Sequence, residues 1–483
     1  MVSRMFNGGL SMFTLAERTP LHVPAFHFFE DRGIVYAIDA EAPNWIAVES
    51  RGAEILGEIA EEPMTFGALV ARYASRHQLE AGKAWLHVHD FLAALGRASM
   101  LSDAPVEGRP YAGRAAYVQP NGLRELWLQI NNACNLSCAH CLVSSGPDGI
   151  AGMPPENVVA TIDAAAALGS ERVYITGGEP FLRRDIFDLA KHITETHGCE
   201  LIVLTNATLF AGRVRELLQT LDREKIKFQV SIDGARAETN DALRGAGTFY
   251  KALDGARLLS DLGFDVSLTT VTTEENLDEL PEIASIAKRV GARSQHLMWS
   301  HRRGRAAESD NGFFPEHAAL LAAVLKTIEA AKSEGVLLDN IETVKRRVNG
   351  VPGVKYDLGN AGWDSLCVYA DGTVYPSAAL ANEKALVCGD VRRTSLAEII
   401  ESSAIISRLR KATLARNAAV ANDPFRFLTG GGDIEHAWCF SGDFLGVDPY
   451  YPITVELTKR VMGELGDEKR ARKNLRSGYD APL

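Results

Sequence analysis

Three cysteines, Cys134, Cys138 and Cys141, lie close enough together in the segment NNACNLSCAHC to bind one metal centre. With seven cysteines in 483 residues, chance would produce this spacing in roughly one sequence in 700. A 4Fe-4S cluster usually takes four cysteines, so three leave one iron open to the amine and carboxylate of S-adenosylmethionine. An electron from the cluster would then break a carbon–sulfur bond homolytically, which supplies a radical that no side chain can make. The alternative is zinc, whose fourth ligand would be His140 or a remote residue.

The elements that must hold such a cluster are indicated by the apolar pattern from Leu126 onward. Apolar runs of strand length alternate there with helical segments, which is typical of strand–helix units and a parallel sheet. Six strands are predicted, at residues 126–130, 172–176, 201–206, 227–233, 265–272 and 293–299. The expected fold class is α/β, a partial (β/α)6 barrel. Its active site is expected in the loops that leave the C-terminal ends of the strands, and the three cysteines directly follow the first strand.

The loops after the next strands carry further candidate residues. The motif GGEP follows the second strand, Thr205 and Asn206 end the third, and Ser231 and Asp233 lie at the end of the fourth. Together, CNLSCAHC and GGEP resemble the radical SAM superfamily. This resemblance implies that the three cysteines hold a 4Fe-4S cluster. It also implies S-adenosylmethionine-binding positions at Gly177, Gly178, Glu179, Pro180, Thr205, Asn206, Ser231 and Arg244. Ala207 replaces the glycine of the family's TNG segment.

The roles of several charged residues near the strand ends can each be interpreted in two ways. The resemblance implies a carboxylate base near the substrate, so Asp233 is the candidate catalytic residue; alternatively it bonds its own backbone in a turn before Gly234. Arg244 either faces the cofactor carboxylate or is solvated. A cluster of arginines after the sixth strand, Arg302, Arg303 and Arg305, either binds a carboxylate or is a solvated charge run.

The C-terminal part begins with the hairpin pattern SLCVYADGTVYPSA, whose Asp371-Gly372 is a strong turn signal. Hairpin and following helix resemble the SPASM or Twitch extension, which implies auxiliary iron–sulfur clusters. Relatives carry cysteines near Asn360 and at Ser377, so two full clusters are not expected here. One cluster is expected at Cys367, Cys388 and Cys439, with His436 as a candidate fourth ligand. The alternative is that these are buried structural thiols, and Cys199 reads as an ordinary core residue.

The N-terminal part contains two short strands around a turn, within residues 26–49, and two amphipathic helices. In pattern it is similar to the RiPP recognition element, a winged-helix-like domain. That resemblance implies a leader peptide that adds a strand beside the hairpin. The alternative is a small domain that only packs on the barrel.

The composition and length of the chain limit the number of domains and the classes of partner that are expected. The length predicts two to four domains, and we divide the chain into residues 1–115, 116–345 and 346–483. The net charge of −11 opposes nucleic acid or an anionic membrane as the main partner. The N-terminus has no continuous apolar signal segment, and the chain has no apolar run of 18 residues, so a cytoplasmic location is expected. The terminal EKRARKNLR reads as a solvated tail.

The resemblance implies a radical SAM oxidoreductase that modifies a ribosomally made precursor peptide. A 5′-deoxyadenosyl radical would abstract hydrogen, leading to a thioether or carbon–carbon crosslink, and an electron donor such as flavodoxin or ferredoxin would reduce the cluster. One alternative is a maturase of a larger protein, such as a quinone-cofactor dehydrogenase subunit or a sulfatase-like target. A noncatalytic iron–sulfur sensor or scaffold is an alternative of another class, although a sensor has no need of GGEP.

Overall fold

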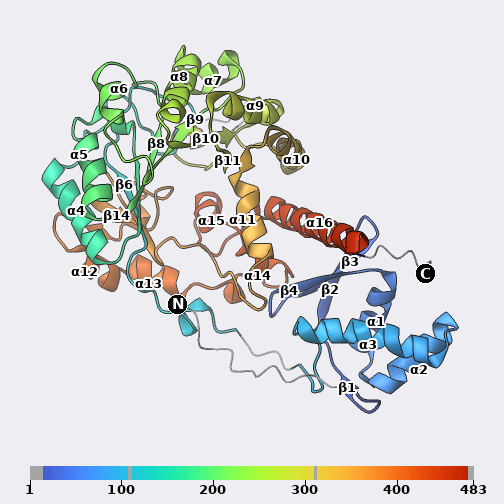
Figure 1. Ribbon diagram of the computed structural model, residues 1–483. Helices are drawn as coiled ribbons and strands as arrows, with labels where there is room; N and C mark the ends of the chain where they lie inside the picture. Colours follow the sequence, from blue (N-terminus) through green and yellow to red (C-terminus); the bar gives the residue numbers. More distant parts are fainter. Residues whose placement is uncertain (1–14, 107–110, 309–312, 477–483) are drawn as a thin grey trace.

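The computed structural model describes residues 15–106, 111–308 and 313–476 (Figure 1). The N-terminal domain, drawn in blue, lies to one side of the barrel with its outer helices. The C-terminal elements, drawn in orange and red, lie below the barrel and reach the N-terminal domain through the long helix α16 (Tyr451–Arg476). In the part of the chain that is described, no helix is both long enough and apolar enough to cross a membrane.

The N-terminal domain is a three-stranded antiparallel sheet covered by three helices. Its strands are β2 (Phe26–Asp31), β3 (Ile34–Asp39) and β4 (Asn44–Val48), with β3 in the centre. Its helices are α1 (Ser50–Glu61), α2 (Phe66–His77) and α3 (Ala81–Arg97). A short two-stranded sheet pairs β1 (Pro20–Leu21) with β5 (Met64–Thr65). The predicted hairpin and two helices are confirmed, whereas β2 and α1 were not predicted from the sequence.

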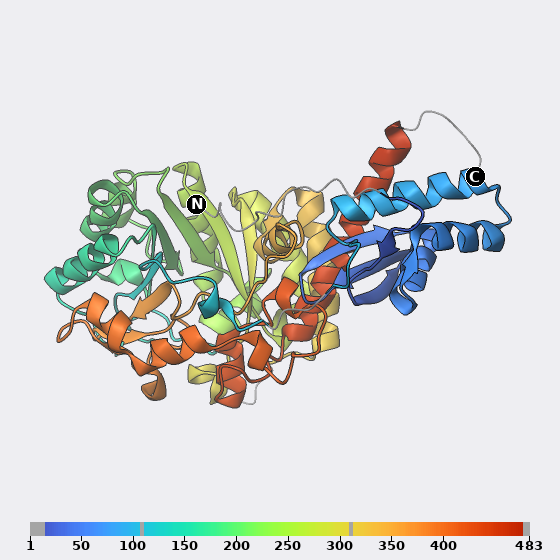
Figure 2. The same cartoon turned by 90° about the horizontal axis from the view of Figure 1, so that it is seen from below.

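All six predicted barrel strands are confirmed, and they pair in parallel in chain order. They are β6 (Glu125–Gln129), β7 (Arg172–Thr176), β8 (Glu200–Thr205), β9 (Ile226–Ser231), β10 (Asp265–Thr272) and β11 (Ser294–Trp299). The outer helices are α4 (Pro155–Ala167), α5 (Ile186–Lys191), α6 (Arg213–Leu218), α7 (Ala237–Arg244), α8 (Thr248–Asp261), α9 (Leu280–Val290) and α10 (His317–Glu334). Figure 2 shows the sheet edge-on with these helices outside it.

The C-terminal region extends the barrel sheet instead of forming a sheet of its own. Strand β13 (Ser365–Val368) pairs in parallel with β6, and β14 (Thr373–Tyr375) and β15 (Gly389–Asp390) follow it in antiparallel order. The predicted hairpin around Asp371-Gly372 is therefore confirmed. At the opposite edge, β12 (Leu337–Leu338) pairs with β11 to complete a ten-stranded sheet.

Helices complete this region. They are α11 (Asp339–Val348), α12 (Leu396–Ser402), α13 (Ala404–Lys411), α14 (Arg426–Thr429) and α15 (Ile434–Ser441). The charged segment expected to be a tail is instead the continuation of α16, which ends at Arg476. Alanine, lysine, arginine and glutamate have high helix propensity, so this composition propagates a helix that has already begun.

Specific contacts dock the N-terminal domain on the C-terminal region. The Trp45 indole N–H donates to the Val348 carbonyl (3.0 Å), and the rings of Phe29 and Phe425 lie 5.7 Å apart. Arg32 forms an ion pair with Asp467 of α16 (2.8 Å). The sheet therefore has one face against α1 and α3 and the other against α16 and its neighbours (Figure 2).

The residues from Tyr111 to Arg114, which precede β6, are anchored on the C-terminal region. The Tyr111 hydroxyl donates to Asp357 (2.8 Å), and the Arg114 guanidinium lies 4.2 Å from the centre of the Trp363 ring. These contacts hold the connection between the N-terminal domain and β6 against the C-terminal region, so the orientation of the three parts is fixed by packing.

Candidate active site

A cavity of about 640 Å³ lies at the C-terminal ends of the barrel strands. It is lined by the cysteine loop and by residues of the loops after the next strands, namely Cys134, Cys138, Cys141, Gly177, Gly178, Thr205, Asn206, Ser231 and Arg244. The C-terminal region supplies the facing wall, including Asn360, Ser377, Asp433 and Glu435. The sequence-predicted loops therefore meet in one space, as expected for a barrel of this type.

The cysteine loop is held by backbone hydrogen bonds. The Leu136 N–H donates to Cys134 Sγ (3.4 Å), and the Ser145 N–H donates to Cys141 Sγ (3.3 Å). Such donors stabilise the negative charge on a metal-bound sulfur. Burial raises the pKa of Cys134 to about 12, and a bound metal cation would favour the thiolate form.

The arrangement of these thiols fits a cluster better than a single zinc ion. A tetrahedral zinc ion draws its ligand atoms to within about 4 Å of one another. Among the described residues, the donor groups that converge within 4.8 Å do not include these cysteines. His140, the fourth zinc ligand considered above, pairs through Nε2 with Asp233 at 3.0 Å, and its Nδ1 has no hydrogen-bond partner, so this contact does not decide between the two metals. A cluster, in which each cysteine binds a different iron, matches the wider spacing.

The GGEP segment packs directly on the cysteine loop. Gly178 N–H donates to the Asn131 carbonyl (3.0 Å), and Glu179 N–H donates to the Ala133 carbonyl (2.9 Å). A Cβ atom on Gly178 would lie 2.0 Å from the Ala133 carbonyl oxygen, so only glycine permits this approach. Buried Asn131 adds side-chain bonds to Gly178 N–H and the Glu179 carbonyl. Its role was not predicted, although its place directly after the first strand was a usable signal.

Glu179 and Pro180 lie one layer behind the cavity wall. The Glu179 carboxylate accepts hydrogen bonds from the Thr205 hydroxyl (2.8 Å) and the Asn206 N–H (2.9 Å), which ties the loop after β7 to the loop after β8. Burial raises the pKa of Glu179 to about 7, in opposition to these bonds. Ala207, at the family's glycine position, has a left-handed φ of 54°, a conformation that glycine adopts at lower cost.

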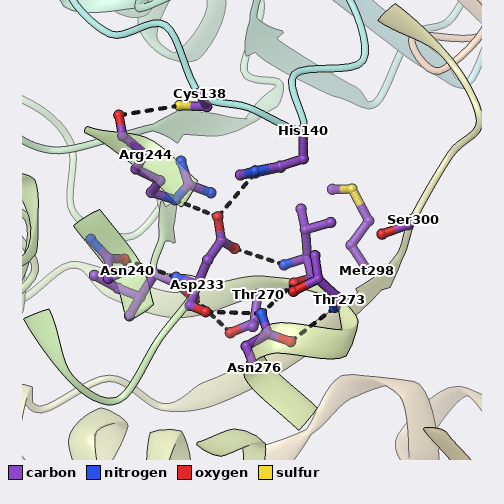
Figure 3. A network of polar contacts seen from close by, with 12 residues as sticks. Cys138, His140, Asp233, Asn240, Arg244, Thr270, Thr273, Asn276, Met298 and Ser300 are labelled. Atoms are coloured by element: carbon purple, nitrogen blue, oxygen red, sulfur yellow. Dashed lines mark hydrogen bonds and ion pairs between the residues drawn. The ribbon is translucent and has the colours of Figure 1, made fainter. Parts of the chain in front are cut away.

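Asp233 is the centre of a buried ion-pair network (Figure 3). Its Oδ2 lies 2.6 Å from Arg244 Nε and 3.0 Å from His140 Nε2, while Oδ1 accepts the Val271 N–H (2.8 Å). The side chain is fully buried. Although burial alone would raise it, the pKa of Asp233 is held well below its ordinary value by Arg244 and His140. This geometry favours a positioning role for Asp233 over the predicted role of catalytic base, because its carboxylate is fully buried, pairs with Arg244 and His140, and is not part of the cavity lining.

The same network fastens the cysteine loop to the fourth strand. His140 lies between Cys138 and Cys141 in sequence, and Cys138 Sγ contacts the Arg244 carbonyl at 3.8 Å. The Ala139 N–H donates to the Leu243 carbonyl (2.8 Å). Arg244 lines the cavity but has its Nε directed at Asp233, so it is not a solvated arginine.

Two of the three arginines make structural contacts, and one of them, Arg305, also lines the cavity. Arg303 donates to the carbonyls of Ala379 and Ala381, which connects the barrel to the C-terminal region. Arg305 Nε donates to the Cys138 carbonyl (2.7 Å), and its backbone N–H donates to the Cys141 carbonyl (3.1 Å). Arg302 is exposed.

The C-terminal cysteines have separate surroundings. Cys367 lies in β13 and Cys388 directly precedes β15, so β14 separates them. Cys388 Sγ contacts the Leu386 carbonyl (3.6 Å), and Cys439 lies in α15. His436, three residues earlier in α15, stacks against His301 with ring centres 4.2 Å apart. The auxiliary cluster at these cysteines stays a prediction, and no step of the proposed function runs through it.

Comparison with known proteins places the chain in a family. The model of the radical SAM superfamily matches residues 128–287, and the SPASM model, an iron–sulfur cluster-binding domain, matches residues 360–422. The chain is therefore a radical SAM protein with a SPASM domain, which uses a 4Fe-4S cluster and S-adenosylmethionine.

Two curated relatives illustrate the range of the family. An AdoMet-dependent heme synthase of Methanosarcina barkeri is 25% identical over 68% of this chain and 96% of its own length. The mycofactocin maturase MftC of Mycolicibacterium smegmatis is 36% identical over 34% of this chain, and the match spans 41% of that protein.

Solved structures of Streptococcus suis SuiB share the fold. SuiB bound to S-adenosylmethionine has a TM-score of 0.54 at 13% identity, covering 88% of this chain and 98% of that one. SuiB bound to the precursor peptide SuiA has a TM-score of 0.53 at 12% identity, covering 86% of this chain and 96% of that chain.

Proposed function

We propose that the protein is a radical SAM maturase that modifies a ribosomally made precursor peptide. The observation that carries this proposal is the cavity, which joins the cysteine loop to a polar wall of the SPASM domain. Its volume is sufficient for the reactive end of S-adenosylmethionine and one or two side chains of a peptide. When bound, the cluster and S-adenosylmethionine supply a 5′-deoxyadenosyl radical, which abstracts a hydrogen atom from the substrate.

The chain's own residues prepare the cavity for this chemistry. Gly177 and Gly178 line the cavity, and their lack of a Cβ lets this loop pack directly on the backbone of the cysteine loop. Buried polar atoms that line the cavity without a protein partner, such as Thr269 Oγ1 and His301 Nε2, are suited to hold ligand groups. The surrounding apolar barrel excludes water from a reactive radical.

The N-terminal domain is the proposed site for the leader of the peptide. Among the described residues, β2 and β4 each have one unpaired edge that could accept an added strand, and we place the leader on the edge of β2. Phe28 on β2 is 38% exposed and offers an apolar contact for such a strand.

An electron donor such as flavodoxin or ferredoxin is proposed to reduce the cluster. The seven free cysteines suit a reducing compartment, which supports a cytoplasmic location.

The proposed function is tested by anaerobic co-expression with short peptides encoded beside the gene. Mass spectrometry should detect one peptide that has lost two hydrogens through a crosslink. Phe28→Ser should lower its yield at least about tenfold through weaker leader binding, while reductive cleavage of S-adenosylmethionine stays unchanged. Tyr250→Ser, which removes an exposed aromatic side chain from the barrel, is the control. Unaltered yield in Phe28→Ser would argue against the β2 edge.

A second candidate function is supported by the heme synthase match, which spans nearly all of that relative. Under it the substrate is a tetrapyrrole rather than a peptide. Purified holoprotein that makes 5′-deoxyadenosine only when a tetrapyrrole is added, and never with peptides, would favour this candidate. Modification of a larger protein subunit would appear in the same assay as a mass change on a folded partner.

Glu179→Gln is expected to raise the Kd for S-adenosylmethionine at least about tenfold. The carboxylate accepts the Phe181 N–H at Oε1 and the Asn206 N–H at Oε2, so in either orientation the new amide NH₂ would face a backbone N–H and one hydrogen bond would be lost. The measurement is isothermal titration with S-adenosylmethionine on the reconstituted protein. Glu171→Gln, an exposed glutamate directly before β7 at the opposite end of that strand, should leave the Kd unchanged. Equal affinity in both variants would exclude Glu179 from the binding machinery.

A further inference from the structure

Three potential metal ligands converge on the outer surface of the barrel, away from the cavity. Asp163 lies on α4, and its Oδ1 is 2.6 Å from His192 Nε2 and 2.7 Å from His197 Nε2. The two imidazole nitrogens lie 3.3 Å apart. All three side chains are outside the cavity lining, so this cluster is separate from the candidate active site.

A π-helical turn brings the two histidines together. Residues His192–Thr196 form this turn directly after α5, and the His197 N–H donates to the His192 carbonyl five residues earlier (3.3 Å). In an α-helix, residues five apart point about 140° away from each other. The wider π turn places them on one face, and such turns occur frequently at functional sites. The rings are perpendicular (89°), and both Nε2 atoms point at the same carboxylate oxygen.

We propose that Asp163, His192 and His197 form a binding site for a divalent transition metal ion, with Zn²⁺ as the preferred class. Two imidazoles and one carboxylate are ordinary zinc ligands at about 2.0–2.2 Å, which puts tetrahedral ligand atoms about 3.4 Å apart. The observed nitrogen–nitrogen distance of 3.3 Å already matches this. The carboxylate oxygen, which lies 2.6 and 2.7 Å from the two nitrogens, would have to move outward by about 0.7–0.8 Å to reach the same spacing, and rotation of the exposed Asp163 side chain can supply that movement.

The exposure of the ligands agrees with an exchangeable ion. The side chains of His192 and His197 are 24% and 21% exposed, and that of Asp163 is 50% exposed. A fourth position therefore remains open to water or to a ligand from another molecule. The ion would join α4 to the end of α5, two helices that flank β7 and the GGEP loop. The site is independent of the proposed peptide chemistry.

The test uses the full chain with its iron–sulfur cluster reconstituted, so that the cysteine loop does not compete for the probe. Isothermal titration with Zn²⁺ alone should give one saturable site, and Co²⁺ should give the visible absorption of a four-coordinate ion. His192→Ala and His197→Ala should each raise the Kd for Zn²⁺ at least about tenfold, with iron content and 5′-deoxyadenosine formation unchanged.

His89→Ala is the matched control, because His89 also pairs with a neighbouring aspartate, Asp90, at 3.2 Å but belongs to no group of three converging ligands among the described residues. Zinc affinity should be unaffected in that variant. Zinc binding that does not saturate near one ion per chain, or that persists unchanged in His192→Ala and His197→Ala, would overturn the proposal. Thermal melts without metal separate loss of ligand from misfolding, since both variants should then melt like the wild type.

Discussion

Replacing Cys134, Cys138 and Cys141 together by alanine is expected to remove about four irons per chain and to abolish 5′-deoxyadenosine formation. The reason is that these thiols line the cavity from a single loop, fixed by backbone bonds to Leu136 and Ser145, and His140, the other potential ligand in this loop, could not hold a cluster alone. Iron and sulfide content with Mössbauer spectra after anaerobic reconstitution measures the loss directly.

Cys199→Ala is the matched control for that experiment. Cys199 is buried, and its Sγ contacts the Ser170 carbonyl (3.1 Å) at the N-terminal end of the barrel. The Cys199→Ala variant should keep the full iron content and the full activity of the wild type. The same measurement counts auxiliary clusters: about eight irons in the wild type would support a cluster at Cys367, Cys388 and Cys439, and about four would make them structural thiols. A triple variant that retained four irons and activity would contradict the assignment of the cysteine loop.

Asp233→Asn is expected to lower iron content and 5′-deoxyadenosine formation together, with a stability loss of about 3–5 kcal/mol. The neutral amide would leave the guanidinium of Arg244 buried without its counter-charge and would weaken the bond to His140 (Figure 3). The cysteine loop would then lose its attachment to the end of β9. Thermal melts, iron content and product analysis are measured on the same preparation.

The outcome distinguishes a positioning residue from a catalytic base. If Asp233 were the base, Asp233→Asn would keep its irons and still cleave S-adenosylmethionine, but would make no modified product. Asp261→Asn, an exposed aspartate at the end of α8, is the control and should behave like the wild type. Because Asp233 lies in a buried ion-pair network with Arg244 and His140, we expect iron content and 5′-deoxyadenosine formation to fall together.

The barrel was predictable because buried parallel strands are continuous apolar runs bounded by turn residues. The segments RVYIT and DVSLTTVT match β7 and β10 to the residue. Strand β2 was not predicted, because FHFFED lacks alternation and lies at a sheet edge where exposure is mixed. The pairing of β13 with β6 was also hidden, since no local pattern encodes a contact between segments so far apart in the chain.

The candidate site was predictable where a motif fixes the backbone conformation. It was not predictable where the role of a side chain depends on the residue that it contacts in the fold. The spacing of the cysteines and the glycines of GGEP specify a loop geometry directly. The local sequence around Asp233, in contrast, does not distinguish a carboxylate that faces a substrate from one that pairs with an arginine. Only the fold shows that Arg244 returns to it from the end of α7. For the same reason, the role of Arg303 as a link to Ala379 and Ala381 could not be read from a charge run.

The parallel pairing of β13 with β6 has a consequence for how the protein is made on the ribosome. Strand β6 leads directly into the cysteine loop, yet its partner on one side is synthesised only after the whole barrel. During translation this edge of the nascent sheet therefore stays unpaired until residues 365–368 have left the ribosome, so β6 and the loop that follows it reach their final packing only after the rest of the barrel has been made.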